Sequence, residues 1–274
     1  MLSFSGCLKK DSMESISIYT TVYPIEYITD RLYGEHSTIK SIYPNDTDIH
    51  SYQLTEKQIK DYSKTNMYIF NGLSDEKNYV SKMFDYNKTL KIIDASSSME
   101  FTYQKEELWL DPSNFLMLSL NIKNGLLEYI DNHYLRESIE KKYESLKLDI
   151  SALDAKYNLL SESADKKTLV VDNNALNFLS KYGFTIFSLD KETVTAKTIA
   201  VVKGLIQKGE IHYIYTLDQN QLNDTVKALQ EETKATTIEL HSLSTLTDKE
   251  RGEKMDYIAL TNQNIEALKQ ELYN

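Results

Sequence analysis

One long run of regularly spaced apolar side chains limits most strongly what this chain can fold into. Positions 135, 139, 143, 146, 150, 153, 157 and 160 all carry leucine, isoleucine or tyrosine, and no glycine or proline interrupts the run. The steps of three and four residues predict one helix over residues 134–163, about 45 Å long, with a single buried face. This stripe is either the seam of a coiled-coil dimer or the core face of a rigid strut.

Strand-like and helix-like segments alternate on both sides of the predicted helix, which favours the strut. Such alternation implies parallel sheets with right-handed crossovers. We therefore predict an α/β monomer with two parallel-sheet lobes of similar topology, joined by one long rigid helix. The boundaries are 16–133 for the N-terminal lobe, 134–163 for the connecting helix and 164–274 for the C-terminal lobe. Strands are expected at 16–20, 38–43, 67–70, 91–93, 168–171, 185–187, 213–215 and 237–240.

The only tryptophan lies in the segment Glu107-Leu108-Trp109-Leu110-Asp111-Pro112. Asp111 followed by Pro112 predicts a helix start, because the aspartate can accept from free backbone N–H groups and proline lacks a donor that would have no partner. The apolar residues before it resemble a strand, so Glu107 is expected at a strand–helix junction, where α/β proteins bind ligands. The alternative is a well-capped helix behind a buried tryptophan.

Composition excludes several classes of protein. A net charge of −10 argues against nucleic-acid binding, since phosphates require clustered lysine and arginine. No run of about 18 apolar residues is present to span a membrane. The eight glycines leave little room for a phosphate-binding loop, and no Ser/His/Asp or cysteine-nucleophile arrangement is evident. We therefore expect a binding protein rather than an enzyme.

The N-terminal residues Phe4-Ser5-Gly6-Cys7 are similar to the end of a bacterial lipoprotein signal, although its basic and long apolar parts are missing. This pattern predicts lipidation of Cys7, the only cysteine, with residues 1–15 as a tether. The protein would then be anchored at the cell surface, on the outer face of the cytoplasmic membrane. The alternative is a tail with an incidental free thiol.

Six groups of residues, spread in order along nearly the whole chain, form a pattern of landmarks. They are Tyr19–Pro24, Tyr43-Pro44 with His50-Ser51-Tyr52, Phe70-Asn71-Gly72, Trp109–Pro112, Ala175–Gly183 and Leu240–Leu243 with Asp256-Tyr257-Ile258. In this order they resemble the zinc- and manganese-capturing substrate-binding lipoproteins of bacterial ABC transporters. The resemblance implies the two-lobed fold with a ligand cleft between the lobes, capture of a divalent metal and delivery of that metal to a permease of the same importer.

The resemblance also implies four metal-binding positions, which fall on His50, Glu107, Asn173 and His241. Two imidazoles and a carboxylate suit Zn²⁺, with Mn²⁺ as the second choice, whereas the neutral amide of Asn173 is a poor ligand for either ion. Each residue also has an ordinary structural interpretation: His50 and His241 as loop or strand-end residues, Glu107 as an outward-pointing acid, and Asn173 as a helix cap.

Two other functions remain open from the sequence. The substitutions at Glu107 and Asn173 would also fit a family member that no longer binds metal and acts as a surface interaction or adhesion protein. The 20 tyrosines would fit a cleft for a small organic ligand, although ordinary core and surface use explains them as well. His36, His133 and His212 fall outside the matched positions and are expected to be structural or solvated.

Overall fold

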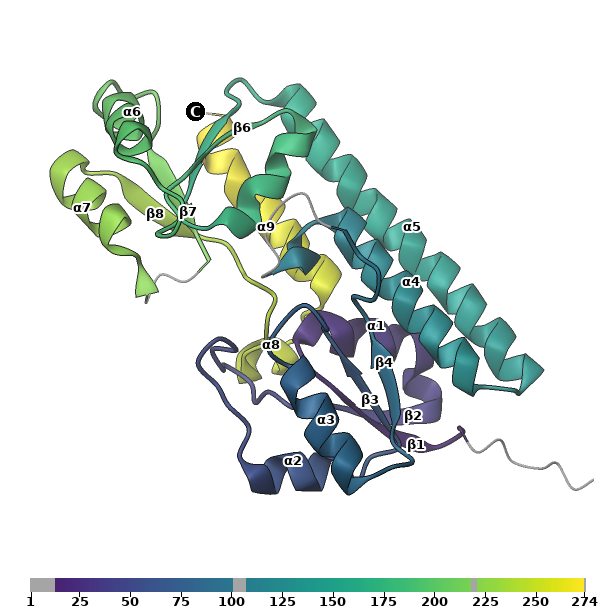
Figure 1. Cartoon of the computed structure of the whole chain (residues 1–274). Helices are drawn as coiled ribbons and strands as arrows, with labels where there is room; N and C mark the ends of the chain where they lie inside the picture. The colour runs from purple at the N-terminus through teal and green to yellow at the C-terminus, as the bar shows by residue number, and fades with distance from the viewer. Residues whose placement is uncertain (1–12, 101–106, 218–220, 274) are drawn as a thin grey trace, which may run out of the picture. The chain divides into compact units, whose positions relative to one another are not determined.

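The computed structural model describes residues 13–100, 107–217 and 221–273 (Figure 1). Cys7, the predicted lipidation site, lies outside the described residues. In the part of the chain that is described, no helix combines the length and the apolar character that crossing a membrane requires.

The first sheet contains four parallel strands in the order β2-β1-β3-β4. Every residue of the central strand β3 is buried, as expected for a parallel strand with helices on both faces. The strands are β1 (Ile16–Thr20), β2 (Ser37–Ser41), β3 (Met67–Phe70) and β4 (Lys91–Asp94), and the helices between them are α1 (Tyr23–Tyr33), α2 (Glu56–Tyr62) and α3 (Lys77–Tyr86).

The second sheet repeats this order as β6-β5-β7-β8, again with every pair parallel. The prediction of two parallel-sheet lobes of similar topology is therefore confirmed. Its strands are β5 (Thr168–Val171), β6 (Thr185–Ser188), β7 (Tyr213–Thr216) and β8 (Thr236–Glu239). The helical elements are the 3-10 segment η3 (Asn174–Tyr182), α6 (Ala196–Gln207), α7 (Asp224–Thr233), α8 (Asp248–Gly252) and α9 (Tyr257–Leu272).

The chain divides into two compact units, each made of several segments that are not contiguous in sequence. The first contains the β1–β4 sheet together with Leu118–Leu146, and the second contains the β5–β8 sheet together with Asn45–Ile49 and Ser98–Met117. Glu107 therefore belongs to the same unit as Asn173 and His241, whereas His50 belongs to the other unit.

The predicted long helix is present as α5 (His133–Ser163), which follows α4 (Pro112–Tyr129). All eight residues of its apolar stripe are buried, and none is more than 7% exposed. The chain itself therefore covers the stripe, which supports the strut and argues against a coiled-coil seam. Leucines on other faces of the same helix are open to solvent, with Leu148 70% and Leu159 61% exposed.

A close backbone approach explains the glycine that follows β3. The Gly72 N–H donates to Asp94 Oδ1 at the end of β4, over 3.0 Å. A Cβ on residue 72 would lie 2.1 Å from the other carboxylate oxygen of Asp94, so only glycine fits there. Asp94 Oδ1 also accepts from the Ser96 backbone N–H, and the carboxylate thereby joins the carboxyl ends of two neighbouring strands.

Two neighbouring leucines of α5 test the role of the stripe. Leu146→Asp places a charge at a position with no exposure, so we expect a loss of about 3–5 kcal/mol in the free energy of unfolding. Leu148→Asp puts the same charge in solvent and should change stability by no more than about 0.5 kcal/mol. Urea unfolding measures both, with sedimentation to report the oligomeric state. Dissociation of a dimer by Leu146→Asp without loss of stability would restore the coiled-coil interpretation.

Candidate metal-binding site

Two of the predicted ligands lie beyond the carboxyl ends of strands in the second sheet. Asn173 follows β5 by two residues and His241 follows β8 by two residues. In this sheet β6 pairs with one edge of β5 and β7 pairs with the other edge. The connection from β5 to β6 and the connection from β6 to β7 therefore run in opposite directions across the sheet, and the carboxyl end of β5 lies at the point where the direction changes. Open α/β sheets bind ligands at such points.

The side chain of Asn173 caps the helical segment that follows it. Its Oδ1 accepts from the Ala175 backbone N–H over 2.7 Å, and its backbone is extended, as usual for a cap. The amide oxygen is thus already engaged at the start of η3. The structural interpretation of Asn173 as a helix cap is confirmed.

Both ring nitrogens of His241 have contacts. Nδ1 accepts from the Leu243 backbone N–H over 2.8 Å, and Nε2 lies 3.2 Å from Glu250 Oε1. Because a backbone N–H can only donate, Nδ1 carries no proton, and the ring is neutral with its proton on Nε2, directed at Glu250. A neutral imidazole is the form that binds metals, but here neither nitrogen is open to an ion without rearrangement.

Glu107 lies in an unusual backbone conformation. The expected strand at Leu108–Leu110 is wrong, because these residues form the 3-10 turn η2 and Glu107 precedes it at φ 46° and ψ 30°. A non-glycine residue rarely adopts this left-handed region. The side chain of Glu107 is buried, with only 4% of the residue exposed.

Hydrogen bonds of Trp109 fix the turn that positions Glu107. Its indole Nε1 donates to the Ser242 carbonyl over 2.8 Å, and its own carbonyl accepts from the buried Tyr257 hydroxyl over 2.6 Å. The Tyr257 ring also stacks on Phe115, with 3.8 Å between ring centroids. Since Ser242 adjoins His241, the tryptophan connects the segments that carry two of the predicted ligands.

The predicted helix start after Trp109 is confirmed. Asp111 Oδ1 accepts from the Ser113 backbone N–H over 2.9 Å at the beginning of α4. The Lys181 ammonium forms an ion pair with Asp111 and donates to Ser113 Oγ over 2.8 Å, so the cap is also anchored to η3. Asp111 therefore caps the start of α4 and also connects that start to η3 through Lys181.

His50 lies in an exposed turn of the other unit. The residues directly before it belong to the second unit, where the Asp46 N–H donates to the Leu246 carbonyl over 3.1 Å and Asn45 Nδ2 donates to Asp248 Oδ1 over 2.6 Å. Among the residues with described positions, no three His, Cys, Asp or Glu side chains form a group that could hold a metal ion. The four predicted ligands are thus divided between the two units: Glu107, Asn173 and His241 belong to one and His50 to the other.

A buried carboxylate that the sequence did not single out lies in the first unit. Glu76 is 3% exposed, and its oxygens accept from Tyr43 Oη over 3.2 Å and from the Asn71 backbone N–H over 3.1 Å. Burial raises the pKa of Glu76 to about 7, against the opposing effect of these hydrogen bonds. In the sequence Glu76 lies in a polar run between Ser74 and Lys77, and nothing there indicates burial.

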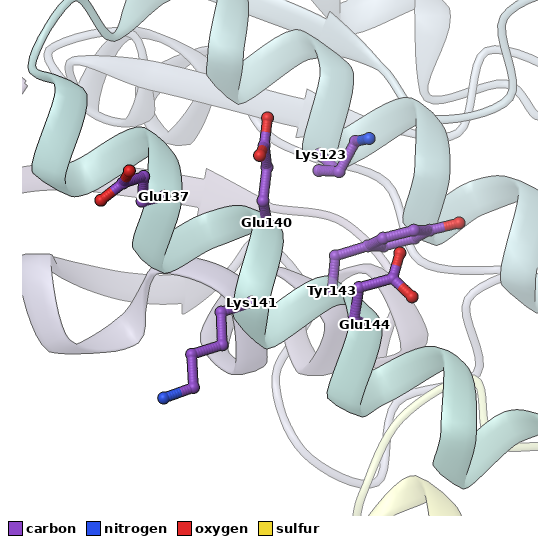
Figure 2. A pocket seen from close by; sticks show the side chains of 6 residues that line it. All are labelled: Lys123, Glu137, Glu140, Lys141, Tyr143 and Glu144. Carbon is purple, nitrogen blue, oxygen red and sulfur yellow. The ribbon is translucent and has the colours of Figure 1, made fainter.

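One open groove of about 410 Å³ lies on the first unit, between α4 and α5 (Figure 2). Its walls are charged on both sides, and the Lys123 ammonium lies 4.9 Å from the centroid of the Tyr143 ring. None of the predicted ligands lines it. The lining residues are Lys123, Glu137, Glu140, Lys141, Tyr143 and Glu144.

The twin parallel sheets joined by a long helix, with polar residues at the strand ends, define a two-lobed binding protein. A sequence model of the family "zinc-uptake complex component A, periplasmic" matches residues 18–271, and the chain belongs to this family. The resemblance noted from the sequence is thereby confirmed.

Individual relatives agree with this assignment. The zinc-binding lipoprotein AdcA of Streptococcus pneumoniae is 24% identical over 96% of this chain, which spans 57% of the length of AdcA. The high-affinity zinc uptake system protein ZnuA of Bacillus subtilis is 22% identical over 94% of this chain and 88% of its own length. The Zn(II)-bound ZnuA-like domain of AdcA has the same fold, with a TM-score of 0.77 at 23% identity over 95% of this chain and all of that domain.

Removing one hydroxyl tests the anchoring of Trp109. Tyr257→Phe keeps the ring stack on Phe115 but leaves the buried Trp109 carbonyl without this donor, so stability should fall by about 1–3 kcal/mol. Tyr273→Phe is the matched control at the C-cap of the same helix: the residue is 42% exposed and loses only a solvent-exposed contact with Ser163 Oγ, so stability should change by less than about 0.5 kcal/mol. Equal melting temperatures for the two variants would contradict the anchoring role.

The raised pKa of Glu76 predicts a pH-dependent stability. A carboxyl whose folded pKa exceeds its unfolded value binds protons more tightly in the folded state, so its contribution to stability is lost as pH rises from about 4.5 through 7. Glu76→Gln removes this titration, and relative to wild type its unfolding free energy should rise by about 3 kcal/mol between pH 4.5 and pH 8. Urea unfolding at both pH values measures the difference. A constant difference between the two proteins would show that Glu76 does not titrate in this range.

Proposed function

We propose that this chain is the metal-capturing, substrate-binding component of an ABC importer, which binds Zn²⁺ outside the cytoplasm and delivers it to the permease. Mn²⁺ is the second choice of ion. The protein binds its cargo rather than transforming it, and we expect it to act as a monomer. Its anchor would be a lipid on Cys7, at the outer face of the cytoplasmic membrane.

The observation that carries this proposal is the Trp109–Ser242 hydrogen bond. It joins the segment of Glu107 to the segment of His241, across 133 residues of sequence, at the carboxyl edge of the second sheet. A carboxylate oxygen and a neutral imidazole nitrogen are donors that zinc accepts in tetrahedral sites. His50 would complete the set from the other unit, so that cargo binding favours a particular arrangement of the two units.

The names of the relatives support a divalent transition metal as the cargo. Zinc-binding AdcA and the zinc-uptake ZnuA match nearly the whole of this chain. The manganese ABC transporter substrate-binding lipoprotein PsaA of S. pneumoniae is 23% identical over 74% of the chain. Two imidazoles among the candidate ligands favour zinc over the harder manganese ion.

A second candidate function rests on the contacts that the predicted ligands already make. Asn173 Oδ1 is occupied by the Ala175 N–H, and both nitrogens of His241 are engaged. In a family member that does not bind metal and acts as a surface interaction or adhesion protein, these groups would form such internal contacts without loss of function. The laminin-binding protein Lbp of Streptococcus pyogenes shares the fold, with a TM-score of 0.73 at 17% identity.

Thermal melting of metal-stripped protein with added cations decides between the two functions. A ligand at a hundredfold excess over its Kd stabilises the folded state by about 2.7 kcal/mol, which for a protein of this size raises the Tm by about 5 °C. We expect Zn²⁺ to raise the Tm more than Mn²⁺, and His50→Ala and His241→Ala each to remove most of the increase. Acidification should weaken binding, because imidazole must be neutral to coordinate a metal.

His133→Ala is the control for the histidine variants, since this side chain is 86% exposed and pairs only locally with Glu137 on α5. It should melt like wild type with and without zinc. A Tm that neither cation moves would end the metal proposal and favour the second candidate.

A further inference from the structure

His241 has a carboxylate partner that lies outside the four expected ligand positions. Glu250 Oε1, in the short helix α8, lies 3.2 Å from His241 Nε2. The side chains of Glu250 and His241 are 19% and 24% exposed, so both are largely removed from water but keep some contact with solvent. Both residues belong to the second unit.

The other oxygen of Glu250 fixes the orientation of this carboxylate. Oε2 accepts from the Thr247 backbone N–H over 2.8 Å and from Thr247 Oγ1 over 2.9 Å, and Thr247 Oγ1 accepts from the Glu250 N–H in return. This is a capping box at the start of α8. These hydrogen bonds hold the carboxylate with Oε1 beside His241 Nε2.

The distance between the two partners suits a shared metal ion. Two ligands about 2.0–2.2 Å from a tetrahedral zinc ion lie about 3.3–3.6 Å from each other. The observed 3.2 Å between Nε2 and Oε1 is within a few tenths of an ångström of that value. Once the ring proton has left Nε2, a small rotation of the imidazole would direct the freed Nε2 lone pair toward an ion bound by both side chains.

Asn173 is the weakest member of the expected set, and Glu250 can take its place. The amide oxygen of Asn173 is neutral and already accepts from the Ala175 N–H. Glu250 presents an anionic oxygen directly beside a candidate ligand. We propose that Glu250 is a ligand of the transported metal, together with His241 Nε2, and this inference rests on the proposed function.

Binding in this way requires a change in the loop after β8. When the metal takes the Nε2 lone pair, the ring proton must move to Nδ1, which then can no longer accept from the Leu243 N–H. Leu243 is fully buried at φ 62°, a left-handed conformation that bulky residues rarely adopt. Metal binding would therefore be linked to rearrangement of the turn at residues 241–243.

Glu250→Gln separates a ligand from a cap. Glutamine serves equally in a capping box, so α8 and the metal-free Tm should be retained, while the anionic oxygen is lost. We expect the Kd for Zn²⁺, measured by calorimetry against a competing chelator, to rise tenfold or more. Glu253→Gln is the matched control, with the same charge change three residues further on at a side chain that is 56% exposed, and its Kd should stay within twofold of wild type.

Cobalt provides a readout that a purely structural role would not change. Co²⁺ absorption bands report the number and type of metal ligands, so Glu250→Gln should alter the spectrum of the Co²⁺-loaded protein and Glu253→Gln should not. Unchanged zinc affinity and cobalt spectrum in Glu250→Gln, with tight binding by wild type, would overturn the role of Glu250 and leave the proposed function intact. Absence of zinc binding by wild type would overturn both.

Discussion

The hydrogen bonds of Trp109 are the contacts on which the arrangement of the second unit depends. The indole donates to the Ser242 carbonyl, and the Tyr257 hydroxyl donates to the Trp109 carbonyl, so one residue joins the segment before α4, the loop after β8 and the helix α9. The Trp109 and Tyr257 side chains are buried, and a buried donor or acceptor that loses its partner costs about 1–3 kcal/mol. Glu107, with its left-handed backbone, lies two residues before this anchored tryptophan, so contacts far away in sequence help to set the position of its carboxylate.

The imidazole of His241 is held by contacts that any ion binding to it would have to displace. Both of its nitrogens are engaged, and the direction of each contact is dictated by the Leu243 N–H, which can only donate. An ion can reach Nε2 only in competition with the Glu250 contact and at the expense of the Leu243 hydrogen bond. Such competition lowers affinity relative to an open site, but it also keeps an otherwise exposed set of polar groups satisfied in the absence of metal.

Much of the fold could be predicted from the sequence because it follows from local periodicity. Strands β1, β3 and β5 have the predicted boundaries, and the stripe of α5 is buried along its whole length. Features imposed by tertiary contacts could not be predicted. The turn at Leu108–Leu110 is as apolar as a strand, Glu76 is buried within a polar run, and α8 is too short for its period to be visible. The ligands could not be assigned from the sequence for the same reason. Asn173 fits a helix cap and a ligand position equally well until its hydrogen bond with the Ala175 N–H is known.

Charge balance gives a further reason to place Glu250 rather than Asn173 beside the ion in the proposed site. A divalent cation with two neutral imidazoles, one carboxylate and one amide carries a net charge of +1, whereas replacing the amide by a second carboxylate makes the assembly neutral. Removing a net charge from water is expensive, and a neutral assembly avoids most of that cost. Glu107 is 4% exposed, so the proposed ion would lie largely out of solvent, where the effect is strongest. In the proposed site, the carboxylate held by the α8 cap would supply the second negative charge, beside that of Glu107, that makes the assembly with zinc neutral.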